Sequence, residues 1–157
     1  MNGTARLATL LATWFGCGYS PGAPGTAGSV GALIPAILLH RYARWNAWDF
    51  GLLALALLAP AIWAADNVAR HTGRKDPQIV VIDEVVGMWI ALAGATALNW
   101  KSWAAAFVLF RLFDVWKPVP VRTLEALPGG VGIVADDVMA GIYAGLVLFA
   151  AGCFNLY

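Results

Sequence analysis

The chain has 157 residues, of which 61% are hydrophobic and only 12% are charged, and its net charge is +1. Soluble domains carry about 25% charged residues, and a domain of this size cannot bury so much apolar surface on its own. The composition therefore indicates an integral membrane protein. The near-neutral charge gives no electrostatic case for a nucleic-acid partner. Cys17 and Cys153 lie far apart without CxxC spacing, so neither a disulfide nor a zinc site is predicted.

The first apolar stretch, residues 5–15, predicts a short helix lying on the bundle or in the membrane interface. It lacks the basic start and the A-x-A site of a removed signal peptide. The Gly-, Pro-, Ser- and Thr-rich run at 16–29 predicts an irregular loop. Thr26 and Ser29 are candidate N-caps for a helix over about 26–40.

Four further apolar segments follow, at 50–65, 85–98, 103–113 and 138–154. Most are shorter than the ~20 residues needed to cross a bilayer unaided, so their polar ends are expected at the membrane boundary. No period of 20–50 residues repeats, which favours a single domain over residues 1–157. The predicted fold is all-α: an integral membrane helical bundle of about four to five transmembrane helices plus a short N-terminal helix.

The order of the segments predicts the topology. If each of the five segments from residue 26 onward crosses once, the stretches 16–29, 66–84 and 114–137 share one face, and 41–49 and 99–102 share the other. The first face carries more cations, and the positive-inside rule makes it cytoplasmic. Its cations are Arg70, Arg74, Lys75, Arg111, Lys117 and Arg122, against Arg41, Arg44 and Lys101 opposite.

Small residues recur four apart in three of the segments: Gly28-Ala32-Ala36, Gly87-Ala91-Ala95 and Gly141-Gly145. Helices in lipid associate through close backbone approach, so such ladders predict helix contacts. Chance in an Ala- and Gly-rich chain explains any single ladder equally well.

Carboxylates stand at the ends of three apolar segments on the predicted cytoplasmic face. Oxygen ligands without His or Cys suit a hard cation, most plausibly Mg²⁺. For a single acid, above all Asp83 or Asp136, a helix N-cap is an equally good explanation. The set as a whole favours metal binding. The predicted metal ligands are Asp83, Glu84, Asp114, Asp136 and Asp137.

Two cations beside these acids suit phosphate binding. Arg111 offers bidentate hydrogen bonds and Lys117 a point charge. The alternative for Arg111 is a local ion pair with Asp114, three residues on. The run from Ser20 to Ser29 could hold a phosphate with its backbone N–H groups, although a plain turn explains it equally well. Asp76-Pro77 is most simply a turn, with a site role as the weaker alternative, and the Gly-rich run at 129–132 is best explained as a flexible loop.

Several phosphatase chemistries are excluded. Ala23 stands where a Cys-x5-Arg loop starting at Cys17 would need Arg, and no Asp-x-Asp pair is present. Two histidines are too few for the His-nucleophile lipid phosphatases, and the CDP-alcohol phosphatidyltransferase pattern is missing. Metal-assisted phosphoryl chemistry at a membrane surface remains.

Four motifs in order, SPGAPGTAGS, VIDEVVGMW, FRLFDVWKPVPVR and GGVGIVADDVMAG, resemble the bacterial phosphatidylglycerophosphatase A family over about residues 16–145. The resemblance implies a magnesium-dependent, multi-pass enzyme of the bacterial inner membrane. It would hydrolyse phosphatidylglycerophosphate, among the membrane lipids, to phosphatidylglycerol and inorganic phosphate. The acidic motif positions of the family fall on the five predicted metal ligands, and its basic ones on Arg111 and Lys117.

We therefore predict Asp83, Asp114, Arg111 and Lys117 as catalytic residues, and Ser20, Thr26, Ser29, Arg111 and Lys117 as substrate-binding residues. A metal-activated water is the favoured nucleophile. A covalent intermediate on Asp114 or Asp83 stays open. The alternative functions are a small ion- or proton-coupled transporter that uses the same acids, and a non-catalytic membrane subunit.

Overall fold

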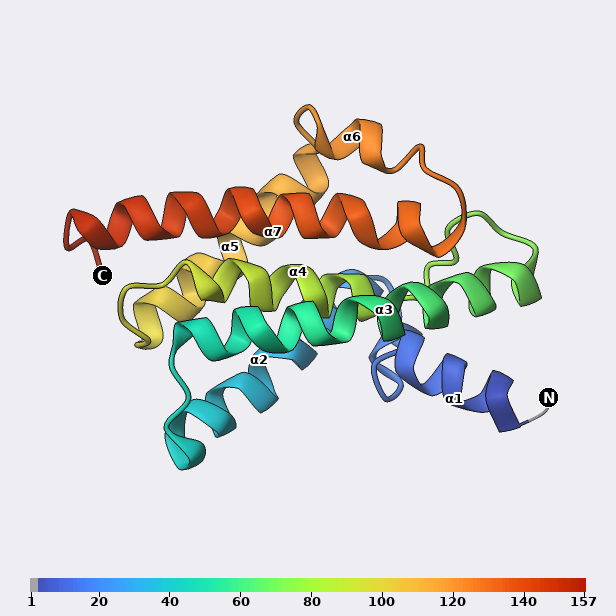
Figure 1. Cartoon of the computed structure of the whole chain (residues 1–157), viewed down its shortest axis with the longest axis horizontal. Coiled ribbons are helices and arrows are strands. Elements are labelled where there is room, and N and C mark those ends of the chain that lie inside the picture. The colour runs from blue at the N-terminus through green and yellow to red at the C-terminus, as the bar shows by residue number, and fades with distance from the viewer. Residues whose placement is uncertain (1–2) are drawn as a thin grey trace.

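The computed structural model describes residues 3–157, and over that range the chain is all-helical, as predicted. The first two residues of the predicted domain, 1–157, lie outside the described residues. Figure 1 shows α3, α4 and α7 running side by side along the long axis, with α2 and α5 inclined to them. The helices are α1 (Gly3–Ala12), α2 (Pro24–Ala43), α3 (Ala47–Thr72), α4 (Ile82–Ala93), α5 (Trp100–Trp116), α6 (Val121–Leu124) and α7 (Gly129–Cys153), with a 3-10 turn, η1 (Cys17–Tyr19), after α1.

Helix α4 lies at the centre of the molecule, in contact with α2, α3, α5 and α7. Most of its side chains are buried, including the largest, Trp89. The indole Nε1 of Trp89 donates a hydrogen bond to the carbonyl oxygen of Ala32 at 3.0 Å, which joins α4 to α2. Because α4 is enclosed, the charged residues of its first turn are held inside the protein.

The contact between α4 and α7 is made by glycines. A Cβ atom on Gly141 would overlap the carbonyl of Gly87, and a Cβ on Gly94 would overlap the carbonyl of Gly145. On the other side of the core, Gly28 of α2 lies directly against Val81. The small-residue ladders predicted from the sequence are confirmed as contact faces, since only glycine lets these backbones approach so closely.

Helix α3 is longer than the predicted segment 50–65. It begins with a capping box, in which Asn46 accepts a hydrogen bond from Trp48 N at 3.0 Å and Asp49 accepts one from Asn46 N at 2.7 Å. Its last turns hold an ion pair between Asp66 and Arg70, 3.0 Å apart. The helix therefore continues through sequence that looks like a polar loop.

Helix α2 begins earlier than predicted, at Pro24. Proline suits a first helical position because its φ is already helical and its missing N–H is not needed there. Ala23 is the N-cap residue, and no side chain caps the helix. The prediction of Thr26 or Ser29 as the N-cap was wrong, since both lie inside α2 and the Ser29 hydroxyl donates to Gly25 O at 2.9 Å.

Helix α7 also begins earlier than predicted, at Gly129, so the run at 129–132 is helical and not a flexible loop. The reason is tertiary: a Cβ on Gly130 would overlap the carbonyl of Ile62 in α3, and Gly130 N donates to Asp66 Oδ1 at 3.3 Å. Asp136 consequently lies about two turns inside the helix, which rules out its role as an N-cap. Asp83 is not a cap either, because α4 has Val81 at its N-cap position.

Within residues 3–157, two helices are long and apolar enough to cross a membrane, α3 and α7. At 26 and 25 residues they are roughly 37–39 Å long, against about 30 Å of hydrocarbon. Helices α4 and α5 have only 12 and 17 residues, so the predicted bundle of four to five transmembrane helices is not confirmed. The short N-terminal helix is present as α1.

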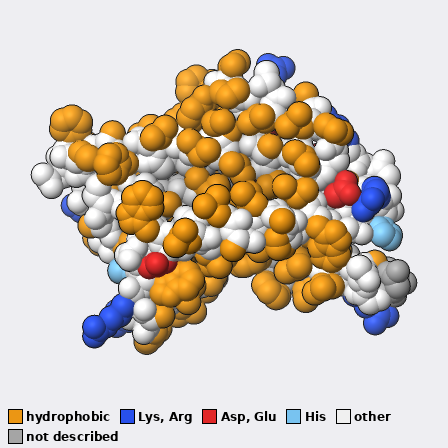
Figure 2. Space-filling model, in the orientation of Figure 1, with side chains coloured by type: hydrophobic (Ala, Val, Ile, Leu, Met, Phe, Trp, Pro, Cys, Tyr) orange, Lys and Arg blue, Asp and Glu red, His pale blue; other side chains and the backbone are white. Residues whose placement is uncertain are grey.

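The surface supports a membrane location. Figure 2 shows hydrophobic side chains covering the middle of the visible face, with charged side chains toward its edges. Large apolar side chains such as Ile34, Leu52, Leu55 and Phe149 are more than 50% exposed. An exposed apolar belt of this kind is costly in water and expected in lipid.

Candidate active site

A cavity of about 250 Å³ lies between the first turns of α2 and α4, the end of α5 and the start of α7. Charged side chains from residues 75–84 and 111–137 line it, and Pro24 and Gly25 line it from the stretch at 16–29. The carboxylates outnumber the cations by seven to three, so the cavity favours the binding of a further cation. The carboxylates are Asp76, Asp83, Glu84, Asp114, Glu125, Asp136 and Asp137, and the cations are Lys75, Arg111 and Lys117.

Three of the carboxylates form the tightest group. Asp83, Glu84 and Asp137 each offer an oxygen, and these three oxygens lie within 4.8 Å of one another. The first two come from the buried first turn of α4, and Asp137 comes from the facing side of α7. The glycine contact one turn further along, between Gly87 and Gly141, brings the two helices close enough for this grouping.

These carboxylates have oxygens without protein partners. Among the described residues, the buried side-chain oxygens that lack a hydrogen bond are Asp83 Oδ1, Glu84 Oε2, Asp136 Oδ1 and Asp137 Oδ2. Buried polar atoms are nearly always paired, and a buried unpaired charge is very costly. All four line the same cavity. An all-oxygen set of this kind fits a hard divalent cation such as Mg²⁺.

The other two predicted ligands have cationic partners. Arg111 Nη1 lies 2.5 Å from Asp114 Oδ2 and 4.0 Å from Glu84 Oε1. The local Arg111–Asp114 pair left open by the sequence is therefore present. It does not remove Arg111 from the cavity, since the guanidinium also lies beside Glu84 and lines the wall.

Lys117 joins three elements at the cavity. It is the C-cap residue of α5 in the left-handed conformation (φ 48°), and its Nζ lies 2.8 Å from Asp136 Oδ2 and 3.1 Å from Glu125 Oε2. Burial lowers the pKa of Lys117, but the hydrogen bonds and charges of these two carboxylates outweigh it and hold the pKa above its ordinary value. Lys117 is therefore a fixed positive charge at any physiological pH.

The predicted phosphate loop contributes backbone and not hydroxyl groups. Of its residues in the described chain, Pro24 and Gly25 line the cavity, whereas Ser20, Thr26 and Ser29 do not. A Cβ on Gly25 would meet Glu84 Oε1 and Arg111 Nη1. The uncapped start of α2, with its free N–H groups, thus lies against the charged residues of the cavity.

Sequence reasoning gave no site role to Lys75, Gln78 and Glu125, and for Asp76 it favoured a turn over a site role, yet all four line the cavity. These residues could have been predicted from their position, because they lie in the polar stretches 66–84 and 114–137, which the predicted topology places on one face. Although Asp76 is exposed as a residue, partial burial of its carboxyl raises its pKa above the ordinary aspartate value, and the charge of Lys117 opposes that rise.

Comparison with known proteins gives a consistent family. The sequence profile described as Phosphatidylglycerophosphatase A matches residues 10–152. Curated proteins of that name from Escherichia coli (strain K12) and Haemophilus influenzae (strain Rd) are 37% and 41% identical to the chain. The matches cover 91% and 90% of this chain and 82% and 86% of those proteins.

A third relative carries a different name. A Bacteroides thetaiotaomicron protein provisionally named as a phosphatidylinositol-3-phosphatase is 42% identical, over 96% of this chain and 97% of its own. No solved structure shows significant similarity to the chain. The profile match spans most of the sequence, and the four motifs that face the cavity lie within it. The chain therefore belongs to the phosphatidylglycerophosphatase A family.

Proposed function

We propose that this protein hydrolyses phosphatidylglycerophosphate to phosphatidylglycerol and inorganic phosphate in phospholipid biosynthesis. Family membership supports the reaction, and the relatives from E. coli and H. influenzae bear the name of that activity. The structural observation that carries the proposal is one cavity that combines clustered carboxylates with Arg111, Lys117 and the uncapped start of α2. Such a cavity suits a phosphomonoester held by cations.

The proposed cofactor is Mg²⁺. Asp83, Glu84 and Asp137 would hold it, because their oxygens are grouped and three of the four unpartnered oxygens belong to them. Asp136, whose other oxygen pairs with Lys117, and Asp114, which pairs with Arg111, would complete the acidic wall. When bound, Mg²⁺ would supply Lewis-acid stabilisation for the phosphate oxygens.

The side chains of the chain itself have separate tasks in this mechanism. Arg111 and Lys117 would bind the non-bridging phosphate oxygens and stabilise their charge as the ester bond breaks. The N–H groups at the start of α2, which lies beside Arg111, would bind the same phosphate. Asp114, oriented by Arg111, would accept a proton from the attacking water. Water forms the new bond to phosphorus, and the bond to the glycerol oxygen breaks. That oxygen would take the proton that Asp114 accepted and leave as phosphatidylglycerol.

The transporter alternative has no support. The acids gather around one cavity at the helix ends and do not follow a path across the molecule. The relatives described above carry phosphatase names.

The proposed location is the bacterial inner membrane, with several crossings and the cavity toward the cytoplasm. Helices α3 and α7 would cross fully. The shorter α4 would lie between them, and α5 would pack against α4 and α7, with the polar ends of both at the boundary. The excess of Arg and Lys on the cavity face supports the cytoplasmic orientation.

The test is phosphate release in detergent micelles, with Mg²⁺ or with EDTA. Phosphatidylglycerophosphate and phosphatidylinositol 3-phosphate should be compared as substrates, since the relatives carry both names. We expect Mg²⁺-dependent release from the first lipid, and a loss on the order of a hundredfold in Asp83→Asn. Asp49→Asn is the matched control because Asp49 caps the far end of α3. Equal activity in EDTA would remove the metal from the mechanism, and a clear preference for the inositol lipid would overturn the proposed substrate.

A further inference from the structure

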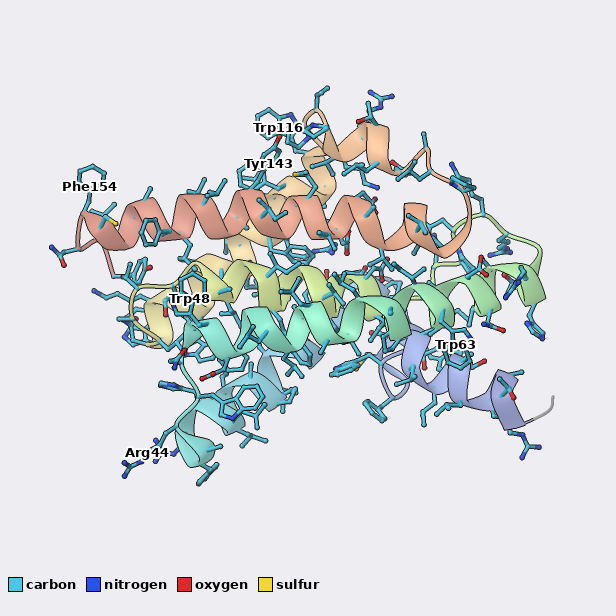
Figure 3. The ribbon with its side chains drawn as sticks, in the orientation of Figure 1. Arg44, Trp48, Trp63, Trp116, Tyr143 and Phe154 are labelled. Atoms are coloured by element: carbon cyan, nitrogen blue, oxygen red, sulfur yellow. The ribbon has the colours of Figure 1, made fainter. Side chains whose placement is uncertain are left out.

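A second, apolar cavity lies directly beside the charged one. This groove, of about 350 Å³, is lined by Phe113, Trp116, Pro118, Val119, Tyr143, Leu146 and Val147. Four of these side chains are large, apolar and strongly exposed: Trp116 (68%), Val119 (76%), Leu146 (62%) and Val147 (43%). Figure 3 shows Trp116 and Tyr143 projecting at the same edge of the molecule, from α5 and α7. The charged residues of the candidate active site do not line the groove.

The two cavities share one stretch of backbone. Asp114 and Lys117 line the charged cavity, whereas their immediate neighbours Phe113, Trp116 and Pro118 line the groove. The left-handed backbone at Lys117 makes this division possible by turning its side chain away from those on either side. The backbone that presents Lys117 to the charged cavity therefore also presents Trp116 and Pro118 to the groove.

Helix α7 gives the direction of the groove. Tyr143 and Val147 follow Asp136 by seven and eleven residues, close to two and three full turns, so the three side chains lie on one face of the helix. Val147 is about 16 Å further along α7 than Asp136. Since α7 is a candidate membrane span, the groove leads from the charged cavity toward the apolar interior of the bilayer.

The walls of the groove are fixed to each other. The Tyr143 hydroxyl donates a hydrogen bond to Val119 O at 3.0 Å, and the Tyr143 ring packs edge-on against Phe113 with ring centres 5.6 Å apart. Phe113 in turn stacks on Trp116. These contacts hold the Lys117 segment on α7, which keeps the groove open beside the cavity.

We propose that this groove binds one acyl chain of the phospholipid substrate while its phosphate lies in the charged cavity. The inference rests on the proposed function, because it assigns the charged cavity to the phosphate and the groove to an acyl chain of the same lipid molecule. A polar-to-apolar path along α7 matches that shape. The acyl chains of other membrane lipids can cover the same groove. The binding free energy of the substrate chain therefore comes from its packing in the groove and not from removal of apolar surface from water. The groove therefore makes the enzyme prefer long-chain substrates.

The experiment compares substrates that differ only in tail length. Rates on dipalmitoyl and on dihexanoyl phosphatidylglycerophosphate should be measured in mixed micelles at a fixed lipid fraction. In Val147→Trp, which fills the groove without touching the charged cavity, kcat/KM for the dipalmitoyl lipid should fall about tenfold, as expected for overpacking a tight apolar site. The rate on the dihexanoyl lipid should change less than about twofold. Ile142→Trp is the matched control, since Ile142 is 39% exposed on α7 but lies outside the groove.

The outcomes separate this inference from the proposed function. Release from neither lipid by the wild type would reject the proposed function itself. A second outcome is that both lipids are hydrolysed and that Val147→Trp and Ile142→Trp show the same chain-length dependence as the wild type. This result would contradict acyl-chain binding in the groove but not the proposed activity.

A second measurement does not depend on the folding of a bulky variant. Asp83→Asn protein should be incubated with phosphatidylglycerophosphate that carries a diazirine near the end of one acyl chain, and then irradiated. Peptides containing Leu146 and Val147 should be labelled more strongly by this probe than by a phosphatidylcholine with the same diazirine. Equal labelling by the two lipids would mean that bulk lipid covers the groove, which contradicts the proposal.

Discussion

Lys117 Nζ lies 2.8 Å from Asp136 Oδ2, and this ion pair joins the end of α5 to the interior of α7. Asp136 is only 5% exposed, so its charge depends on that partner. Lys117 therefore has two roles: it stabilises the fold, and it contributes a positive charge to the cavity. Mutations can separate the two roles.

Lys117→Met should destabilise the protein by about 2–3 kcal/mol, since it leaves a buried carboxylate without its cation. The double variant Lys117→Met/Asp136→Leu should recover most of that stability, because no unpaired charge remains. Neither variant should recover phosphatase activity, since the phosphate would have lost its lysine. Thermal unfolding and phosphate release together check the prediction. Lys101→Met, at the opposite end of α5, is the control, and full activity in the double variant would contradict a role for Lys117 in binding phosphate.

Asp137→Asn should have opposite effects on the stability of the protein in the presence and in the absence of Mg²⁺. In EDTA the variant should be more stable than the wild type, because one of three grouped carboxylates is neutralised. Mg²⁺ at a hundred times its dissociation constant should stabilise the wild type by about 2.7 kcal/mol and the variant much less. Melting curves with and without Mg²⁺ measure both effects and require no substrate. An equal Mg²⁺ shift in the two proteins would remove Asp137 from the ligand set.

Gly141→Ala should weaken the packing of α4 on α7. The added Cβ would overlap the carbonyl of Gly87, which is backbone and has no rotamer to move. We expect a loss of about 1–3 kcal/mol, together with a weaker response to Mg²⁺ as Asp137 moves away from Asp83. Gly3→Ala is the control, since a Cβ there meets nothing within 4 Å. A Gly141→Ala protein with unchanged stability would show that the helices separate easily at this point.

Two neighbouring substitutions in α2 distinguish backbone from hydroxyl contributions. Gly25→Ala should greatly reduce activity, because the new Cβ would meet Glu84 and Arg111 at the cavity wall. Ser29→Ala should retain activity and lose about 1 kcal/mol of stability, since its hydroxyl is bonded to Gly25 O inside the helix. Rates and melting temperatures of both variants check this. Loss of activity in Ser29→Ala with an unchanged melting temperature would instead show that the Ser29 hydroxyl contributes to substrate binding.

The fold class and the grouping of the acids could be predicted from the sequence, whereas the first residues of the helices could not. The hydrophobic segments predicted an all-helical chain, and the acids of the polar stretches do line one cavity. The local rule that Gly-Gly breaks a helix failed at Gly130, because close packing against Ile62 of α3 requires glycine there. Asp66 looked like part of a polar loop for a related reason: besides its local ion pair with Arg70, it accepts a hydrogen bond from Gly130 N, 64 residues away in the chain. Contacts of this kind leave no trace in a local pattern.

The count of four to five membrane crossings is not confirmed, for a different reason. Hydropathy treats every apolar segment alike, whereas α4 is apolar because it is enclosed by protein. Lys75, Gln78 and Glu125 were missed as cavity residues because their role depends on how two loops fold over the helix ends.

The glycine contact between α4 and α7 also bears on how the enzyme responds to its membrane. Asp83 and Gly87 are one turn apart on α4, as are Asp137 and Gly141 on α7, so the spacing of the carboxylates is set by backbone touching backbone. Membranes of different thickness make embedded helices tilt. Two helices locked at their glycines would tilt as one body, and the distance between their carboxylates would stay constant. Changes in lipid composition should therefore alter how substrate reaches the cavity well before they alter the cavity itself.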